Sequence, residues 1–147
     1  MIDQRTPYVP NLNPADIAGP SRDIYARMGG ENLYRMIEAF YLELGTSAIR
    51  SMFPEDLVAS SRKSAAFFAQ LLGGPQDYTE RHGPPRMRAR HLPFQITPQA
   101  REEWLLCFER VLARAVNDFG FPAEHLEGFR LFLQKFSAWM VNAAGDA

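Results

Sequence analysis

The chain has 147 residues, which suits one domain of ordinary size, and 46% of them are apolar, which is enough for a hydrophobic core and excludes wholesale disorder. Sixteen Lys and Arg against seventeen Asp and Glu give a net charge of -1, which argues against a general nucleic-acid binder but permits a local basic patch. One cysteine, Cys107, excludes a disulfide framework and multi-cysteine metal sites, and the three histidines are too scattered for an HExxH helix.

The first predicted element is an extended arm over residues 1–20. It carries Pro7, Pro10, Pro14 and Pro20 and shows no sustained periodicity. The composition is typical of a surface wrap or of a disordered tail. We therefore expect the folded domain to cover residues 21–147.

Helices follow the arm. A short helix is predicted over 22–28, ended by Gly29-Gly30, and an amphipathic helix over 31–44, where apolar residues recur with helical spacing. Residues 46–54 form a corner in which Pro54 favours an extended Phe53. The next helix is predicted over about 57–72.

The second half of the chain begins with residues 75–90, which are rich in Pro, Gly and Arg and predict a loop with no more than one short helical turn. Thr97 before Pro98 is typical of a helix start, and Gly120 ends that helix. Pro122 opens the last helix. No segment alternates like a strand, so the sequence predicts an all-α fold with four long helices.

Two hydroxyls share a helix face with core-forming residues, because Ser60, Ser64 and Phe67 fall at i, i+4 and i+7. Each serine either bonds a carbonyl one turn earlier or lines a pocket for a small polar ligand. The sequence leaves both interpretations open.

A basic segment over residues 81–91 holds four arginines and no acid. It is either a solvated charge run or a site for an anionic ligand, since arginine suits carboxylates and phosphates. His91 ends this segment. A single histidine can be the sole protein ligand of a haem iron, but a lone histidine more often has no metal-binding role. Tyr41 and Trp104 lie on inward helix faces, where ordinary aromatic core is the simpler explanation.

Several ordered motifs together resemble the truncated haemoglobin family, its group II in particular. They are IYARMGG at 24–30, FY at 40–41, FPED at 53–56, FFAQLLGGP at 67–75 with Tyr78, RMRARHLPF at 86–94 and WLLC at 104–107. The similarity extends over about residues 23–142. It implies a two-over-two helical sandwich around haem b (iron protoporphyrin IX), with His91 as the proximal iron ligand.

The resemblance also assigns roles around the haem. Tyr41, Ser60, Ser64 and Trp104 would lie on the ligand side, where Tyr41 and Trp104 donate hydrogen bonds to a bound diatomic molecule. The residues implied in holding the haem itself are Phe53, Phe67, Tyr78, Arg86, Arg88, Arg90 and Phe94. Relatives commonly carry a larger side chain at the position of Ser64, so ligand affinity is not transferable from them.

Three functions remain as hypotheses. The first is reversible binding of O2, and of NO and CO, by a haem protein. The second is a haem enzyme that carries out NO dioxygenation or peroxidase-type oxidation with electrons from an unidentified reductase. The third is a haem-free helical module that binds an anion or a nucleic acid through residues 81–90.

The surroundings of the protein are predicted from absent signals. No stretch reaches the roughly 18 apolar residues of a membrane span, and the first residues lack the pattern of a signal peptide. We therefore expect a cytoplasmic protein with neither a membrane nor a nucleic acid as partner.

Overall fold

The computed structural model describes residues 8–145. Its helices are α1 (Ile24–Met28), α2 (Gly30–Gly45), α3 (Leu57–Leu71), α4 (Asp77–His82), α5 (Met87–His91), α6 (Pro98–Phe119) and α7 (Leu126–Met140), with 3-10 helices η1 (Pro14–Asp16), η2 (Arg50–Met52) and η3 (Ala123–His125). Residues 8–145 include no β-strand, and the predicted all-α class is confirmed. Within the same residues, no helix is both long and apolar enough to cross a membrane.

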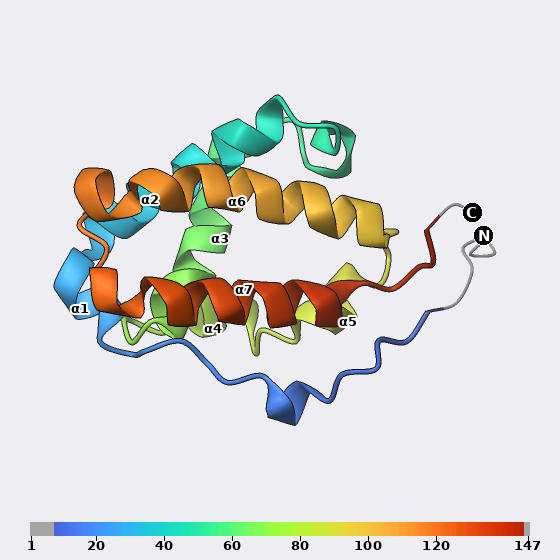
Figure 1. The fold of residues 1–147 in the computed structure, drawn as a ribbon, viewed down its shortest axis with the longest axis horizontal. Helices are drawn as coiled ribbons and strands as arrows, with labels where there is room; N and C mark the ends of the chain where they lie inside the picture. Colours follow the sequence, from blue (N-terminus) through green and yellow to red (C-terminus); the bar gives the residue numbers. More distant parts are fainter. Residues whose placement is uncertain (1–7, 146–147) are drawn as a thin grey trace.

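The four long helices form two pairs, α2 with α3 and α6 with α7. Helices α6 and α7 run antiparallel to each other, and α2 packs against both α3 and α6 (Figure 1). Phe40 from α2 and Phe108 from α6 stack at the centre with ring centroids 4.0 Å apart, and both are fully buried. This aromatic contact fixes the spacing between the two pairs.

Helix ends follow the predicted signals. The Thr97 hydroxyl accepts from the Ala100 N–H at 3.1 Å and starts α6, as predicted. The structure adds a cap that was not predicted, because the Asp56 carboxylate accepts from the Ala59 N–H at 3.1 Å and starts α3. Gly120 adopts a left-handed conformation, with φ +64°, where α6 ends. The last helix differs in detail, because Pro122 precedes η3 and α7 begins only at Leu126.

The segment 75–90 departs from the prediction, since it contains α4 and the start of α5 rather than one turn at most. Helices of five or six residues are too short to show a hydrophobic period. Tertiary contacts stabilise them instead. Tyr78 of α4 is buried, and the Gln70 side-chain carbonyl accepts from the Thr79 N–H at 3.1 Å.

Gly73 and Gly74 let the chain around α1 pack closely against the end of α3. A Cβ at Gly74 would lie 2.6 Å from the ring of Tyr25, and one at Gly73 would collide with the Arg22 carbonyl. Gly73 also has φ +98°, which favours glycine. The Tyr25 N–H donates to the Leu72 carbonyl at 3.1 Å and joins α1 to the end of α3.

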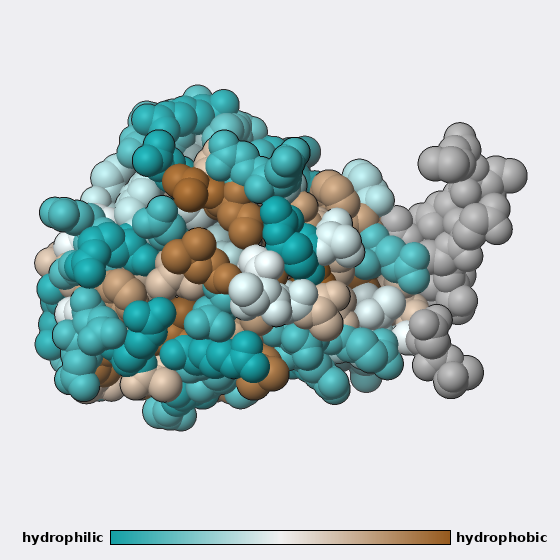
Figure 2. All heavy atoms as spheres, turned by 90° about the horizontal axis from the view of Figure 1, so that it is seen from above, coloured by the Kyte–Doolittle hydropathy of each residue, from teal (hydrophilic) through white to brown (hydrophobic). Residues whose placement is uncertain are grey.

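The predicted arm, residues 1–20, is described only from residue 8 onward, and residues 1–7 lie outside the described part, as do 146 and 147 of the predicted domain. Ile17 packs against the core, and the Tyr8 carbonyl accepts from Arg88 at 3.3 Å. The outer face seen in Figure 2 is largely hydrophilic, with a few apolar side chains gathered near its middle.

Candidate functional site

A cavity of about 520 Å³ opens between the helices. Such a volume is within the range of small-molecule and cofactor sites. It is lined by ten of the twelve residues singled out from the sequence, namely Tyr41, Phe53, Ser60, Ser64, Phe67, Tyr78, Arg90, His91, Phe94 and Trp104. The other two, Arg86 and Arg88, are not among its lining residues.

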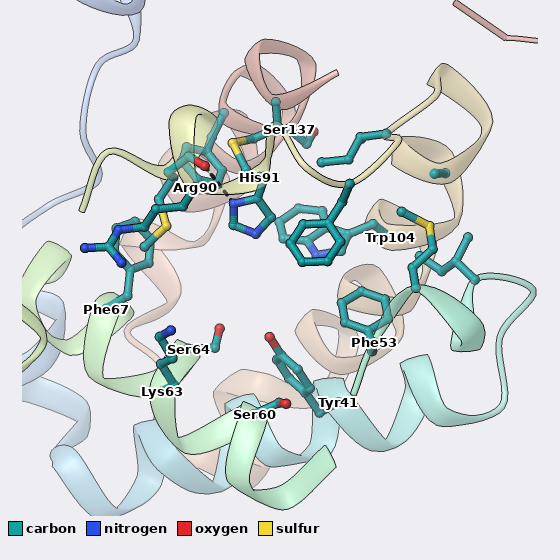
Figure 3. A pocket seen from close by; sticks show the side chains of 18 of the residues that line it. Tyr41, Phe53, Ser60, Lys63, Ser64, Phe67, Arg90, His91, Trp104 and Ser137 are labelled. Carbon is teal, nitrogen blue, oxygen red and sulfur yellow. Dashed lines mark hydrogen bonds between the residues drawn. The ribbon is translucent and has the colours of Figure 1, made fainter. Parts of the chain in front are cut away.

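His91, the last residue of α5, points into the cavity (Figure 3). Its Nδ1 lies 2.7 Å from the Met87 carbonyl oxygen. Because a carbonyl only accepts hydrogen bonds, Nδ1 carries the proton, and Nε2 of the neutral ring keeps a free lone pair. Burial lowers the pKa of His91, and this outweighs the Met87 hydrogen bond, which raises it. The ring is therefore a neutral imidazole suited to ligating a metal.

Three hydroxyl groups lie across the cavity from His91. Tyr41 comes from α2, Ser60 and Ser64 come from α3, and the phenol oxygen of Tyr41 is directed toward the cavity (Figure 3). Burial raises the pKa of Tyr41, and this effect is larger than the opposing effect of the Ser64 hydroxyl, which lowers it. The phenol thus remains a protonated donor at neutral pH.

The serines on this face distinguish the two interpretations left open by the sequence. Ser61, one position away, donates to the Val58 carbonyl at 2.7 Å, which is the local bond expected of a tolerated helix serine. Ser64 instead lies near enough to Tyr41 to lower the pKa of its phenol, and both Ser60 and Ser64 line the cavity. The hydroxyls at 60 and 64 therefore lie with the Tyr41 phenol on the side of the cavity opposite His91.

Aromatic rings fix the positions of Tyr41 and Trp104. The buried ring of Phe40 makes edge contacts with both, at centroid distances of 5.6 Å to Tyr41 and 5.4 Å to Trp104. Phe53 contacts Tyr41 edge-on at 5.9 Å, and Phe108 packs against Trp104 at 5.3 Å. Both polar aromatics are partly buried against the core and line the cavity.

The arginines of the basic segment have separate roles. Arg90 lines the cavity, lies 5.6 Å from the ring centroid of Tyr78 and donates to the carbonyls of Pro85, at 2.6 Å, and Pro84, at 3.0 Å. Arg88 donates to backbone carbonyls at the end of α7. Arg86 is exposed and has a left-handed backbone, with φ 40°.

Sequence reasoning missed Lys63, a cation on the cavity wall. In the view of Figure 3, Lys63 and Arg90 lie on one side of the cavity, and Phe53 lies on the other. A signal was present, because Lys63 follows Ser60 by three residues and so shares its helix face. The contribution of α7, through Phe136, Ser137 and Met140, was also missed.

Comparison with known proteins identifies the family. The family model of the bacterial-like globins, which describes their sequences, matches residues 23–142 of this chain. The chain belongs to the bacterial-like globin family. This globin is 42% identical over 119 residues to Group 2 truncated hemoglobin YjbI of Bacillus subtilis, a match that covers 80% of the chain and 87% of that relative.

Solved structures agree with this assignment. The group II truncated hemoglobin from Bacillus anthracis is 36% identical with a TM-score of 0.74, and the match covers 83% of this globin and 97% of that chain. The structure of phosphate-bound Hell's gate globin IV is 33% identical with a TM-score of 0.79, covering 99% and 88% of the two chains. The predicted group II truncated haemoglobin family and its helical sandwich are confirmed, and membership implies haem-based ligand binding.

The residues of the cavity fit a haem group. A flat apolar ring system needs aromatic walls, which Phe53, Phe67 and Phe94 provide. Its iron needs a neutral imidazole, which His91 provides. Its carboxylates need cations, which Lys63 and Arg90 place on the cavity wall.

Proposed function

We propose that this globin holds haem b in its cavity through His91 and binds O2, NO and CO reversibly on the opposite side. The observation that supports this most strongly is the His91 ring, whose Nδ1–H is taken up by the Met87 carbonyl so that the Nε2 lone pair is left for iron. When bound, haem supplies an iron centre that takes a diatomic gas. Family membership independently favours haem over a haem-free anion-binding module.

In this proposal Tyr41 and Trp104 select and retain the ligand. The phenol O–H and the indole N–H each donate to the diatomic molecule, and Ser60 and Ser64 supply smaller donors beside them. A hydrogen bond to a charged acceptor contributes about 1.5–3 kcal/mol. Donors fixed before the ligand arrives stabilise it at little cost in reorganisation, and the contacts of both rings with Phe40 hold them in place.

Polar residues on the cavity wall hold the haem carboxylates. Arg90 and Lys63 supply positive charge, and the Tyr78 hydroxyl is a further donor. Phe53, Phe67 and Phe94 pack on the macrocycle. Arg86 and Arg88, which the family resemblance also assigned to the haem, do not line the cavity and are left out of this set. A separate reductase keeps the iron reduced.

Reconstitution with hemin tests the proposal. Wild-type protein is expected to bind one haem per chain, His91→Gly is expected to lose tight binding, and added imidazole is expected to restore the optical spectrum of histidine-ligated haem. His125→Ala, on η3 and outside the cavity lining, is the matched control and should bind normally. A His91→Gly variant with unchanged haem affinity and spectrum would contradict the proposal.

A second measurement separates binding from catalysis. NO is mixed with the oxygenated protein in the presence of a reductase, and nitrate is followed over repeated additions. Sustained nitrate formation would assign NO dioxygenation to the same site. A stable oxygenated protein without turnover leaves ligand binding as the function.

A further inference from the structure

We propose that Arg88 and Asn142 form a reciprocal clasp between α5 and the segment that follows α7, and that this clasp sets the orientation of His91. The two residues are 54 positions apart, and each bonds the backbone of the other's segment. They are positioning residues, because neither lines the cavity. The effect of the clasp on the bond between His91 and iron rests on the proposed function, whereas its ordering of the backbone of residues 91–96 does not.

Asn142 supplies one half of the clasp. Its side chain is buried, and its amide nitrogen donates to the carbonyls of His91, at 3.2 Å, and Phe94, at 2.9 Å. Its amide oxygen accepts from the Ile96 N–H at 2.9 Å. Carbonyls only accept and a backbone N–H only donates, so these partners fix the orientation of the amide. One side chain thus binds three backbone groups between residues 91 and 96.

Arg88 supplies the other half. It precedes His91 by three residues, and its Nη1 donates to the carbonyls of Trp139, at 2.5 Å, and Val141, at 2.7 Å. The last carbonyls of a helix lack partners within the helix and carry the negative end of its dipole. A guanidinium placed there satisfies both needs and joins α5 to the end of α7.

Helix α5 needs such an anchor because it has only five residues. The hydrogen bonds of Arg90 go to carbonyls between residues 82 and 85, so they join α5 only to its own loop. The hydrogen bond between His91 and Met87 lies within α5 and turns with it. Two backbone hydrogen bonds also join these segments, from the Asn142 N–H at 3.0 Å and the Ala143 N–H at 3.2 Å to the Ile96 carbonyl. The clasp is the side-chain part of this connection, and it is the part that reaches α5 itself, at Arg88 and at the His91 carbonyl.

The test compares wild-type protein with Asn142→Ala and Arg88→Met, and uses Asn32→Ala as control. Asn32 also donates its side-chain amide to a backbone carbonyl, that of Met28 at 3.0 Å, but it is not among the cavity-lining residues. In the haem-loaded ferrous protein, the iron–histidine stretching band is measured by resonance Raman spectroscopy. Haem loss to excess apomyoglobin and amide exchange of Phe94 in the apoprotein complete the set.

The clasp predicts a shifted or broadened iron–histidine band, haem loss about tenfold faster, and faster exchange at Phe94 in both clasp variants. Asn32→Ala should leave all three at wild-type values. Arg88→Lys retains the charge and a single donating nitrogen on a shorter side chain, and it should show a smaller effect. If Asn142→Ala does not fold, Asn142→Asp, which retains the acceptor for Ile96, is used with Arg88→Lys.

Folded clasp variants with a wild-type Raman band and wild-type exchange at Phe94 would overturn the inference. A wild-type protein that takes up no haem would overturn the proposed function instead. In that case the exchange measurement on the apoprotein still decides whether the clasp orders residues 91–96.

Discussion

Trp104 and Ser64 both line the cavity, but they make different contacts. The indole of Trp104 packs against Phe40 and Phe108, and in the proposed function its N–H donates to the bound ligand. The Ser64 hydroxyl lies near the Tyr41 phenol and lowers its pKa. Trp104→Phe is therefore expected to accelerate O2 dissociation about tenfold or more, and Ser64→Ala is expected to have a smaller effect. Stopped-flow dissociation rates check this. Equal rates in the two variants would mean that Trp104 only packs.

His91 also makes the stability of the apoprotein depend on pH. Burial lowers its pKa below the ordinary 6.5, so the unfolded chain binds the proton more readily than the folded one. The stabilisation is complete above pH 6.5 and is lost as the pH falls through the lowered value. Urea unfolding of the apoprotein between pH 7.5 and 5 should show this loss, and the loss should be smaller in His91→Gly. Identical pH profiles of stability in wild-type protein and His91→Gly would show that His91 is not the group responsible.

The helical pattern places several of the cavity-lining residues on one face of a long helix, while the family resemblance suggested their roles. Tyr41, Ser60, Ser64, Phe67 and Trp104 follow from helical spacing, because a face repeats every three or four residues. Of the three arginines that the resemblance suggested, Arg90 lines the cavity and Arg86 and Arg88 do not. Neighbouring residues of a five-residue helix point in different directions, so Arg88 and Arg90 acquire unrelated partners. Asn142 carries no local signal, since its partners are about 50 residues away.

At the scale of elements, the joint between α1 and α3 depends on Gly73. A Cβ there would collide with the Arg22 carbonyl, and φ +98° is strained for any other residue. Gly73→Ala is expected to destabilise the protein by about 1–3 kcal/mol. Thermal unfolding measures the change.

Gly128 provides the matched control for that substitution. It lies inside α7, and a Cβ added to it meets nothing within 4 Å. Gly128→Ala should therefore stabilise the protein by about 0.5–1 kcal/mol, because alanine is the better helix former. If both substitutions change the unfolding temperature in the same direction, the packing at Gly73 is not what the structure indicates.

The long helices were predictable because caps and periodicity agree over several turns. Thr97 and Gly120 each mark an end that the structure reproduces. Helices α4 and α5 were not predictable in this way, because each spans fewer than two turns and depends on contacts such as Gln70 with Thr79. The least predictable elements thus include α5, the one that carries His91.

For the whole molecule, haem binding and folding are linked. A ligand that binds only the folded state stabilises it, by about 2.7 kcal/mol at a hundredfold excess over its dissociation constant. Hemin should therefore raise the unfolding temperature of the apoprotein by several degrees. Metal-free protoporphyrin IX is the control and should give a smaller rise, since it cannot bond His91. Equal rises would show that the iron is not ligated by the protein.

The central claim is that His91 holds a haem whose other side, guarded by Tyr41 and Trp104, takes O2 reversibly. An optical titration of the purified, reduced protein from anaerobic to aerobic conditions tests it most directly. The expected result is the spectrum of a histidine-ligated ferrous haem that converts to a stable oxygenated form and returns when O2 is removed. A protein without porphyrin absorption after exposure to hemin, or a ferrous spectrum that O2 leaves unchanged, would contradict the claim.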